Sequence, residues 1–295
     1  MRRVLWDDSL VNKAAGVFVK VTEPSSRIEE AIPERVKHWA RLALNAEYRR
    51  QAREKQRLRK IPRYTRTHTY LLGGRLELVD PESFLSMYDQ IFVRQIYRFE
   101  SSNDVPLIID GGANIGMSVL YFKELYPRSR IIAFEPDPAV FQTLKTNLDT
   151  FRLQGVELVP RALWTDDTDL EFTQEGGEAG RLRRVEGPHR TIKVAGTRLK
   201  SYLDRQVDFL KLDIEGAETD VLKDCAAELP RVQRLFVEYH SFADDPQTLH
   251  ELLSLLNHAG FRMHIHSVLP SPQPFVKRFV NFGMDFQANI FAFRS

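Results

Sequence analysis

The sequence predicts an α/β fold with a doubly wound, largely parallel sheet, and three observations support this. An apolar run, Leu107–Ile109, leads through a glycine-rich turn into a helical segment, Met117–Leu125. A second apolar run, Ile131–Phe134, follows and stops at the acid Glu135. Strand-like and helical segments then alternate along the rest of the chain. Strand, glycine-rich turn, helix, strand and acid together are typical of the nucleotide-binding half of such a sheet.

The residues before this pattern form a helical region with one hairpin. A helix is predicted over Glu34–Leu58, and its end carries a basic run: Arg49, Arg50, Arg53, Lys55, Arg57, Arg59 and Lys60. This run is either a solvated face or a collar that attracts an acidic partner. Short strands around Gly73-Gly74 predict a hairpin over Thr67–Val79. Asp80 then caps a helix whose apolar residues continue to Tyr97.

The remaining elements complete the predicted sheet. After Glu135 we expect a helix, a third strand, a long polar segment of strands joined by a mobile loop, and then further strands and helices. Their ranges are Ala139–Phe151, Gly155–Val159, Glu171–Lys200, Val207–Leu212, Leu235–Val237, Pro246–Ala259, Phe261–Ile265 and Asn289–Phe293. The last strand closes a hairpin and runs antiparallel to its neighbour.

The amino-acid composition limits which classes of protein this chain can belong to. With 43% hydrophobic residues in 295, the chain can bury a large core, and a net charge of +2 gives no general field for nucleic acid or membranes. The one cysteine, Cys225, excludes an intramolecular disulfide framework, and no apolar run reaches the length of a membrane span. We therefore predict a cytoplasmic protein with a helical N-terminal extension, residues 1–103, and a second domain, residues 104–295.

The glycine-rich turn indicates its ligand. It reads D-x-G-x-N-x-G and begins at Asp110, whereas a dinucleotide-binding turn reads G-x-G-x-x-G and must accept a pyrophosphate. A carboxylate at this place would repel phosphate and suit the cationic methionine end of S-adenosylmethionine (SAM). A dinucleotide remains the alternative ligand, and a tight turn without any ligand is the third interpretation.

Four motifs, taken in order, resemble the FkbM family of SAM-dependent methyltransferases. They read IIDGGANIGMS, AFEPDP, FLKLDIEGAE and VEYH, and the segment YDQIFVRQIYRF before them is also similar to that family. The resemblance covers roughly residues 65–293. It implies the class I methyltransferase (Rossmann-like) fold, with a seven-stranded sheet whose last strand is antiparallel. Studied members mostly methylate hydroxyl groups of sugars, polyketides and other secondary metabolites.

The resemblance also implies roles for particular residues. The methionine and ribose parts of SAM would be held by Asp110, Gly112, Asn114 and Gly116, and the ribose hydroxyls by Glu135. The acceptor side would be lined by Asp213, Glu215, Glu238 and His240. From its position after the third strand, the run Ala162–Trp164 offers apolar side chains that either sandwich the adenine or simply cap the sheet. The chain lacks an Asn/Asp-Pro-Pro-Tyr motif after the fourth strand, which disfavours methylation of base amines.

An aliphatic hydroxyl is a poor nucleophile at neutral pH and needs a base or a metal ion. His240 is the predicted base, since its intrinsic pKa suits proton transfer near pH 7, and Asp213 and Glu238 would orient it. Alternatively Asp213, Glu215 and Glu238 hold a divalent cation, for which oxygen ligands favour Mg²⁺ or Ca²⁺. Glu215 and Glu218 have a third interpretation, as acids in the first turn of the following helix.

The sequence therefore predicts a SAM-dependent O-methyltransferase that acts on a small-molecule or glycan acceptor, with no membrane partner. One alternative is a non-catalytic SAM- or nucleotide-binding scaffold. Another is a methyltransferase whose acceptor is carrier-bound or a nucleic acid, although the sequence lacks supporting nucleic-acid motifs. The apolar helix Phe84–Tyr97 is predicted to pack on the sheet or to form a homodimer.

Overall fold

The computed structural model describes residues 46–174, 180–181, 190–268, 271–277 and 279–294. Its backbone contacts divide the chain into two compact units, residues 1–52 and 53–295. The predicted helix Glu34–Leu58 appears as α3 (Ala46–Leu58), and its earlier part lies outside the described residues. Within α3, Glu47 pairs with Arg50 and Glu54 with Arg57, so part of the basic run is offset locally. An acidic partner for the rest stays a prediction.

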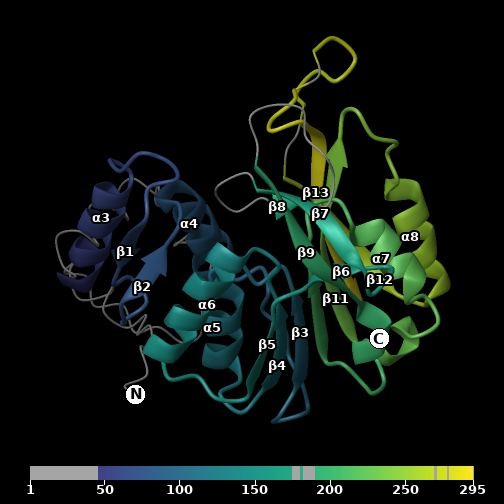
Figure 1. Ribbon diagram of the computed structural model, residues 1–295, viewed down its shortest axis with the longest axis horizontal. Coiled ribbons are helices and arrows are strands. Elements are labelled where there is room, and N and C mark those ends of the chain that lie inside the picture. The colour runs from purple at the N-terminus through teal and green to yellow at the C-terminus, as the bar shows by residue number, and fades with distance from the viewer. Residues whose placement is uncertain (1–45, 175–179, 182–189, 269–270, 278, 295) are drawn as a thin grey trace, which may run out of the picture. The chain divides into compact units, whose positions relative to one another are not determined.

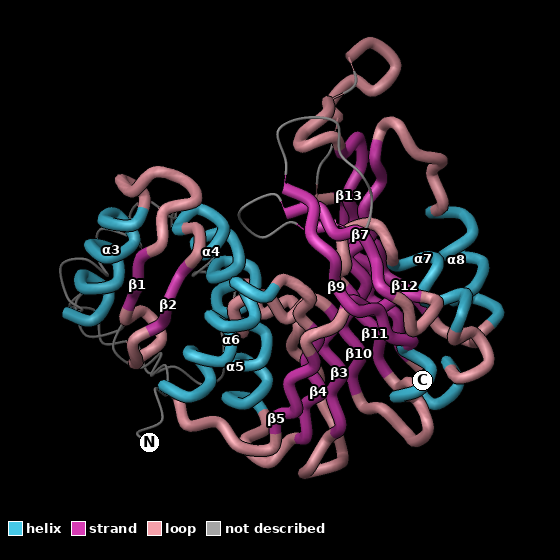
Figure 2. The backbone as a smooth tube through the Cα atoms, viewed as in Figure 1, coloured by secondary structure: helices cyan, strands magenta, loops and turns pink. Residues whose placement is uncertain are grey.

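The central feature of the second unit is a seven-stranded sheet in the order β12-β13-β11-β10-β3-β4-β5 (Figures 1 and 2). Its strands are β3 (Leu107–Gly111), β4 (Arg130–Phe134), β5 (Val156–Val159), β10 (Phe209–Leu212), β11 (Arg234–Phe242), β12 (Arg262–Ser267) and β13 (Met284–Phe293). The pairs from β5 to β11 are parallel, whereas β13 is antiparallel to both β11 and β12. The predicted doubly wound sheet with an antiparallel last strand is confirmed.

Helices cover both faces of this sheet. The helices α5 (Met117–Leu125) and α6 (Pro138–Thr150) share one apolar cluster, and α7 (Glu218–Asp224) and α8 (Leu249–His258) share another (Figure 1). Side chains alternate across a strand, so the neighbours Ile108 and Ile109 of β3 fall into the first and second cluster, respectively. Burial on both faces explains why β3 reads as a continuous apolar run.

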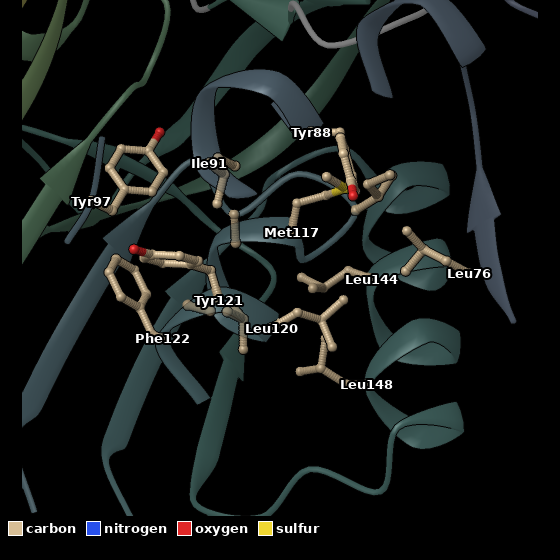
Figure 3. Packing of buried hydrophobic residues seen from close by; sticks show 14 of the residues in the cluster. Leu76, Tyr88, Ile91, Tyr97, Met117, Leu120, Tyr121, Phe122, Leu144 and Leu148 are labelled. Carbon is tan, nitrogen blue, oxygen red and sulfur yellow. The ribbon is translucent and has the colours of Figure 1, made fainter. Parts of the chain in front are cut away.

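The first cluster fixes the helix that follows the glycine-rich turn (Figure 3). Met117 of α5 is buried with Leu144 and Leu148 of α6, and Leu76 from the N-terminal hairpin joins them. Gly116 has φ +93°, and a Cβ there would lie 2.7 Å from Leu144 and 2.8 Å from Leu148. Gly116 therefore permits both the turn into α5 and the close packing of α5 on α6.

The N-terminal part of this unit packs on the same core. The predicted hairpin is confirmed as β1 (Thr67–Thr69) paired with β2 (Leu76–Leu78). The predicted helix is shorter than expected, because α4 (Pro81–Tyr88) passes into a π-helical turn, η2 (Asp89–Val93). Its apolar side chains Phe84, Tyr88 and Ile91 are buried within the chain's own core. The dimer and the domain boundary at residue 103 both stay predictions.

Asp80 lies at the N-terminus of α4, as expected, but its side chain caps no backbone N–H of that helix. Instead its carboxylate accepts hydrogen bonds from the Arg63 guanidinium at 2.7 Å and from the Ser83 hydroxyl at 2.7 Å. The backbone N–H of Tyr64 also donates to it, at 3.0 Å. A guanidinium is a stronger partner for a buried carboxylate than a neutral N–H, which explains the departure from a simple cap.

A second, four-stranded sheet follows β5 in the order β6-β9-β7-β8. Its strands are β6 (Ala162–Trp164), β7 (Asp169–Gln174), β8 (Gly180–Arg181) and β9 (Arg190–Arg198). The strands predicted in Glu171–Lys200 are thus present, while the predicted loop falls partly on residues 175–179 and 182–189, outside the described residues. Two 3₁₀ turns, η3 (Leu199–Tyr202) and η4 (Leu229–Arg231), complete the elements. Among the described residues, no helix combines the length and the apolar character needed to cross a membrane.

Gly112 in the turn after β3 gives a test of this fold. Its φ is +80°, and a Cβ would lie 1.9 Å from the backbone oxygen of Asp213, whereas Gly73 has the same φ with no atom within 4 Å of its Cβ position. Gly73→Ala should cost about 1–2 kcal/mol of unfolding free energy for the left-handed backbone alone. Gly112→Ala should cost about 2 kcal/mol more, because a backbone oxygen cannot yield as a side chain does. Urea unfolding of both variants measures the difference, and equal losses would contradict the predicted clash.

Candidate active site

A cavity of about 810 Å³ opens at the edge of the sheet where the parallel strands end. This is the place where open α/β sheets bind ligands. Of the predicted site residues, those that line the cavity are Gly112, Asn114, Glu135, Ala162, Asp213, Glu215, Glu238 and His240. Asp110 and Gly116 lie behind the wall. The sheet therefore brings both predicted groups, for cofactor and for acceptor, to one cavity.

Glu135 holds the glycine-rich turn at one end of the cavity. Its carboxylate accepts hydrogen bonds from the backbone N–H of Asn114 at 3.0 Å and of Asp137 at 2.9 Å. The turn is tied to the end of β4 as well, since Gly112 and Ala113 both donate to the carbonyl of Phe134. Burial raises the pKa of Glu135 to about 8, although these backbone hydrogen bonds act in the opposite direction.

Asp110 does not face the cavity, which changes the argument made from its charge. Its side chain is fully buried, accepts a hydrogen bond from Ser118, and lies 3.2 Å from the ammonium of Lys211. The Lys211 ammonium also donates to the carbonyl oxygens of Gly111 and Gly112, at 3.2 and 2.8 Å. The negative charge of Asp110 is thus used inside the protein to anchor the turn, and a ligand would meet other carboxylates.

Lys211 was missed by the sequence analysis. It lies in the buried strand β10 with its side chain 3% exposed, 3.4 Å from the Asp213 carboxylate. Burial would lower its pKa, but the charges of Asp110 and Asp213 outweigh this effect and raise it. The lysine in the middle of the apolar run F-L-K-L could have indicated this site residue, because a buried cation requires an anionic partner.

The end of the cavity that is predicted to bind the acceptor is built by β11 and the turn after β10. Glu238 and His240 were expected at the end of a strand, but β11 continues to Phe242. Its parallel pairing with β10 ends at Val237, and the extension is held by β13 alone, with His240 opposite Gln287. Glu238 and His240 are two residues apart on this extension, so both point to the same side.

His240 is held by Glu218, the first residue of α7. Its Nδ1 lies 3.0 Å from the Glu218 carboxylate, which also accepts hydrogen bonds from the backbone N–H groups of Ile214 and Gly216. Because this carboxylate only accepts, Nδ1 carries the hydrogen and Nε2 faces Glu215, at 3.6 Å. Glu218 thus lies in the first turn of α7, as one interpretation expected, and its carboxylate holds both the imidazole and the turn before the helix, whereas Glu215 precedes α7.

The charges around His240 shift its titration. Burial alone would lower the pKa of His240, but the carboxylates of Glu215 and Glu218 outweigh it and hold the pKa well above its ordinary value. For the two neighbouring glutamates burial acts in the other direction, and it raises the pKa of Glu215 to about 8 and that of Glu238 to about 7. Among the described residues, this network consists of two groups of ion pairs: Lys211 with Asp110 and Asp213, and His240 with Glu215, Glu218 and Glu238. The acids outnumber the bases, so a cationic ligand would stabilise the ionised forms of Glu215 and Glu238.

A group of possible metal ligands lies within this network. One ligand atom each of Asp213, Glu238 and His240 lies within 4.8 Å of the other two. Glu215, which the sequence analysis placed in the ligand set, is not part of this group. Two carboxylates with an imidazole form a ligand set that suits Zn²⁺, Mn²⁺ or Fe²⁺. The predicted set had oxygen ligands alone, which would favour Mg²⁺ or Ca²⁺.

The N-terminal segment and β13 also contribute to the cavity, which the sequence analysis did not foresee. Arg63, Arg66 and Met87 line it from the hairpin region and α4, and Gln287 lines it from β13. Gln287 donates through its side-chain amide to the Glu238 carboxylate. Ala162 of β6 also lines the cavity, and the predicted contact with adenine stays a prediction.

The sheet order, with its inserted antiparallel strand and glycine-rich turn, defines a class I, Rossmann-like methyltransferase fold. The family model described as "Methyltransferase FkbM domain" matches residues 110–263, a little over half of the chain. This protein belongs to the FkbM methyltransferase domain family, as the four sequence motifs indicated.

Two relatives and one solved structure illustrate what the chain is similar to. "Methyltransferase 1" of Beauveria bassiana is 32% identical over 162 residues, which are 46% of this chain and 65% of that protein. "2-O-methyltransferase NoeI" of Sinorhizobium fredii is 27% identical over 173 residues, 50% of this chain and 68% of that protein. Precorrin-6y C5,15-methyltransferase from Geobacter metallireducens is 15% identical with a TM-score of 0.42, covering 70% of this chain and 87% of that one. The match to the Beauveria protein thus spans less than two thirds of its length.

Proposed function

We propose that this protein transfers the methyl group of SAM to a hydroxyl group of an acceptor, with His240 as the base. One observation carries the proposal: a single cavity is lined by the glycine-rich turn and Glu135 at one end and by His240 at the other. Methyl transfer from a sulfonium is an in-line displacement, so the acceptor oxygen must lie directly behind the methyl carbon. A cavity that holds both ligands side by side meets this need.

SAM fits the charges of the cavity better than a dinucleotide does. The carboxylates of Asp213, Glu215 and Glu238 line it and would attract the ammonium and sulfonium groups of SAM. They would repel the pyrophosphate of a dinucleotide. Asp110 does not add to this attraction, because its charge is offset by Lys211. Glu135 would accept hydrogen bonds from the ribose hydroxyls when SAM is bound.

In the proposed mechanism, SAM supplies an activated methyl group and the chain handles the acceptor proton. Nε2 of His240 would accept the proton of the attacking hydroxyl while the O–CH₃ bond forms and the methyl–sulfur bond of SAM breaks, with the neutral thioether as the leaving group. Glu218 receives the hydrogen bond from Nδ1–H and stabilises the imidazolium. Lys211 fixes the position of Asp213 and of the turn.

We propose a hydroxylated acceptor, such as a sugar, a polyketide or another secondary metabolite, free or carried by a larger molecule. The relative named as a 2-O-methyltransferase supports an oxygen acceptor. The direct test is a calorimetric titration with SAM and, separately, with NAD, followed by methyl transfer to a panel of hydroxylated sugars and polyketides. Binding of NAD in place of SAM would overturn the proposal. Binding of SAM with no transfer to any acceptor would favour the non-catalytic scaffold.

Metal-assisted deprotonation is a second candidate mechanism, favoured by the group Asp213, Glu238 and His240. We expect turnover to survive removal of divalent ions with a chelator, because Lys211 already contacts Asp213 and Gln287 already contacts Glu238. The measurement is the methyl-transfer rate before and after chelation. A large loss that Mg²⁺ or Mn²⁺ restores would instead assign the deprotonation to a metal ion.

A further inference from the structure

The chain between β12 and β13 exposes an unusual amount of apolar surface. In Figure 1 this segment is the yellow loop that leads into the start of β13. We call residues 271–277 and 279–282 the tip. Of ten large apolar side chains that are exposed in the described part of the chain, five lie in the tip: Phe275, Val276, Phe279, Val280 and Phe282. Phe275 is 103% exposed and Val276 is 83% exposed, so both side chains lie almost entirely in water.

The tip has a defined backbone conformation. The backbone N–H groups of Val276 and Lys277 both donate to the carbonyl of Gln273, at 2.9 and 2.8 Å. The Ser271 hydroxyl donates to the carbonyl of Lys277 and accepts from the N–H of Phe279, which ties the two sides of the tip together. These hydrogen bonds hold Phe275 and Val276 at the apex of a turn. Exposing them costs free energy that a partner surface would recover.

The charge of the segment indicates the kind of partner. Lys277 and Arg278 stand between the apolar pairs Phe275-Val276 and Phe279-Val280, and the sequence has no acid from Val268 to Met284. Aromatic and aliphatic side chains interleaved with basic ones are typical of segments that insert into the headgroup region of an anionic lipid surface. A purely apolar protein partner would leave Lys277 without a counter-charge.

We propose that the tip inserts its apolar side chains into an anionic lipid surface, with Lys277 contacting lipid headgroups. This would be peripheral binding, for which no membrane-spanning helix is needed. The overall charge of the chain, in contrast, predicted no membrane partner. The tip also borders the cavity, because Asn281 and Phe282 line it and the Phe282 ring lies 5.5 Å from the Arg63 guanidinium. Binding would therefore hold the mouth of the cavity at the lipid surface. The proposal does not depend on the methyl-transfer reaction.

Co-sedimentation with vesicles tests the proposal. The full chain should bind vesicles of phosphatidylcholine mixed with phosphatidylserine more tightly than vesicles of phosphatidylcholine alone, and salt should weaken the binding. Phe275→Ser combined with Val276→Ser should weaken it about tenfold or more, since each side chain loses its apolar transfer energy. Val93→Ser, which changes a side chain 56% exposed elsewhere on the chain, should leave binding unchanged.

Three outcomes would overturn the proposal. The wild-type chain could fail to bind the anionic vesicles, or the double tip variant could bind them as tightly as the wild type. The tip variant could also convert a dimer, measured by light scattering, into a monomer while no vesicle binding occurs, which would make a second copy of the chain the partner. Equal thermal unfolding temperatures for the wild-type chain and both variants would show that the fold is preserved.

Discussion

His240→Ala should reduce kcat for methyl transfer by about 10²–10⁴-fold while SAM still binds, because the acceptor hydroxyl loses its base. His240 has the required surroundings: its side chain is 2% exposed, Nδ1 is held by Glu218, and Nε2 faces the cavity side. The measurement is the single-turnover rate of methyl transfer beside a calorimetric titration with SAM. His250→Ala is the matched control, since that side chain is 79% exposed.

The pH dependence gives a second readout for His240. Its pKa is held well above the ordinary value by Glu215 and Glu218, so at neutral pH a smaller fraction of the imidazole is free to act as a base than in an unperturbed histidine. kcat/KM should therefore rise as pH increases above 7. Glu215→Gln removes the charge 3.6 Å from Nε2 and should move this rise to lower pH. A pH profile that Glu215→Gln leaves unchanged, or full activity of His240→Ala, would contradict the assignment.

Glu135→Ala should weaken SAM binding about a hundredfold or more, because two charge-assisted hydrogen bonds to ribose hydroxyls would be lost. The carboxylate also holds the N–H groups of Asn114 and Asp137, so its removal loosens the turn as well. Calorimetry measures the affinity. Glu157→Ala on the neighbouring strand β5 is the control, because that glutamate is exposed.

A conservative variant separates charge from shape at this position. Since burial raises the pKa of Glu135 to about 8, a large part of the side chain is uncharged at pH 7 without ligand. SAM affinity should rise as pH increases toward 9, as the carboxylate ionises and becomes the better acceptor. Glu135→Gln should bind weakly and with a smaller dependence on pH, because Glu215 and Glu238 still titrate in this range. An unchanged affinity in both Glu135 variants would exclude this residue from the cofactor site.

Local patterns in the sequence predicted most of the sheet. Apolar runs with glycine or acid at their ends gave β3, β4 and β10, and the helix Met117–Leu125 was predicted at its observed bounds. These segments are defined by burial and by turn chemistry, which neighbouring residues encode. The predicted end of β11 was wrong, because the strand is extended by its pairing with β13. The predicted end of the helix after Asp80 was also wrong, because that helix passes into a π-helical turn for which the sequence has no local signal.

The sequence by itself determined the family, the sheet and the end of the sheet at which Glu135, Asp213 and His240 meet. It could do so because parallel strands bring their carboxyl ends to one edge. Only the tertiary structure decided which carboxylates face the cavity, since this depends on partners distant in the chain. Lys211 pairs with Asp110 inside the protein, and Glu218 holds His240. The tip stays exposed although many of its residues are apolar.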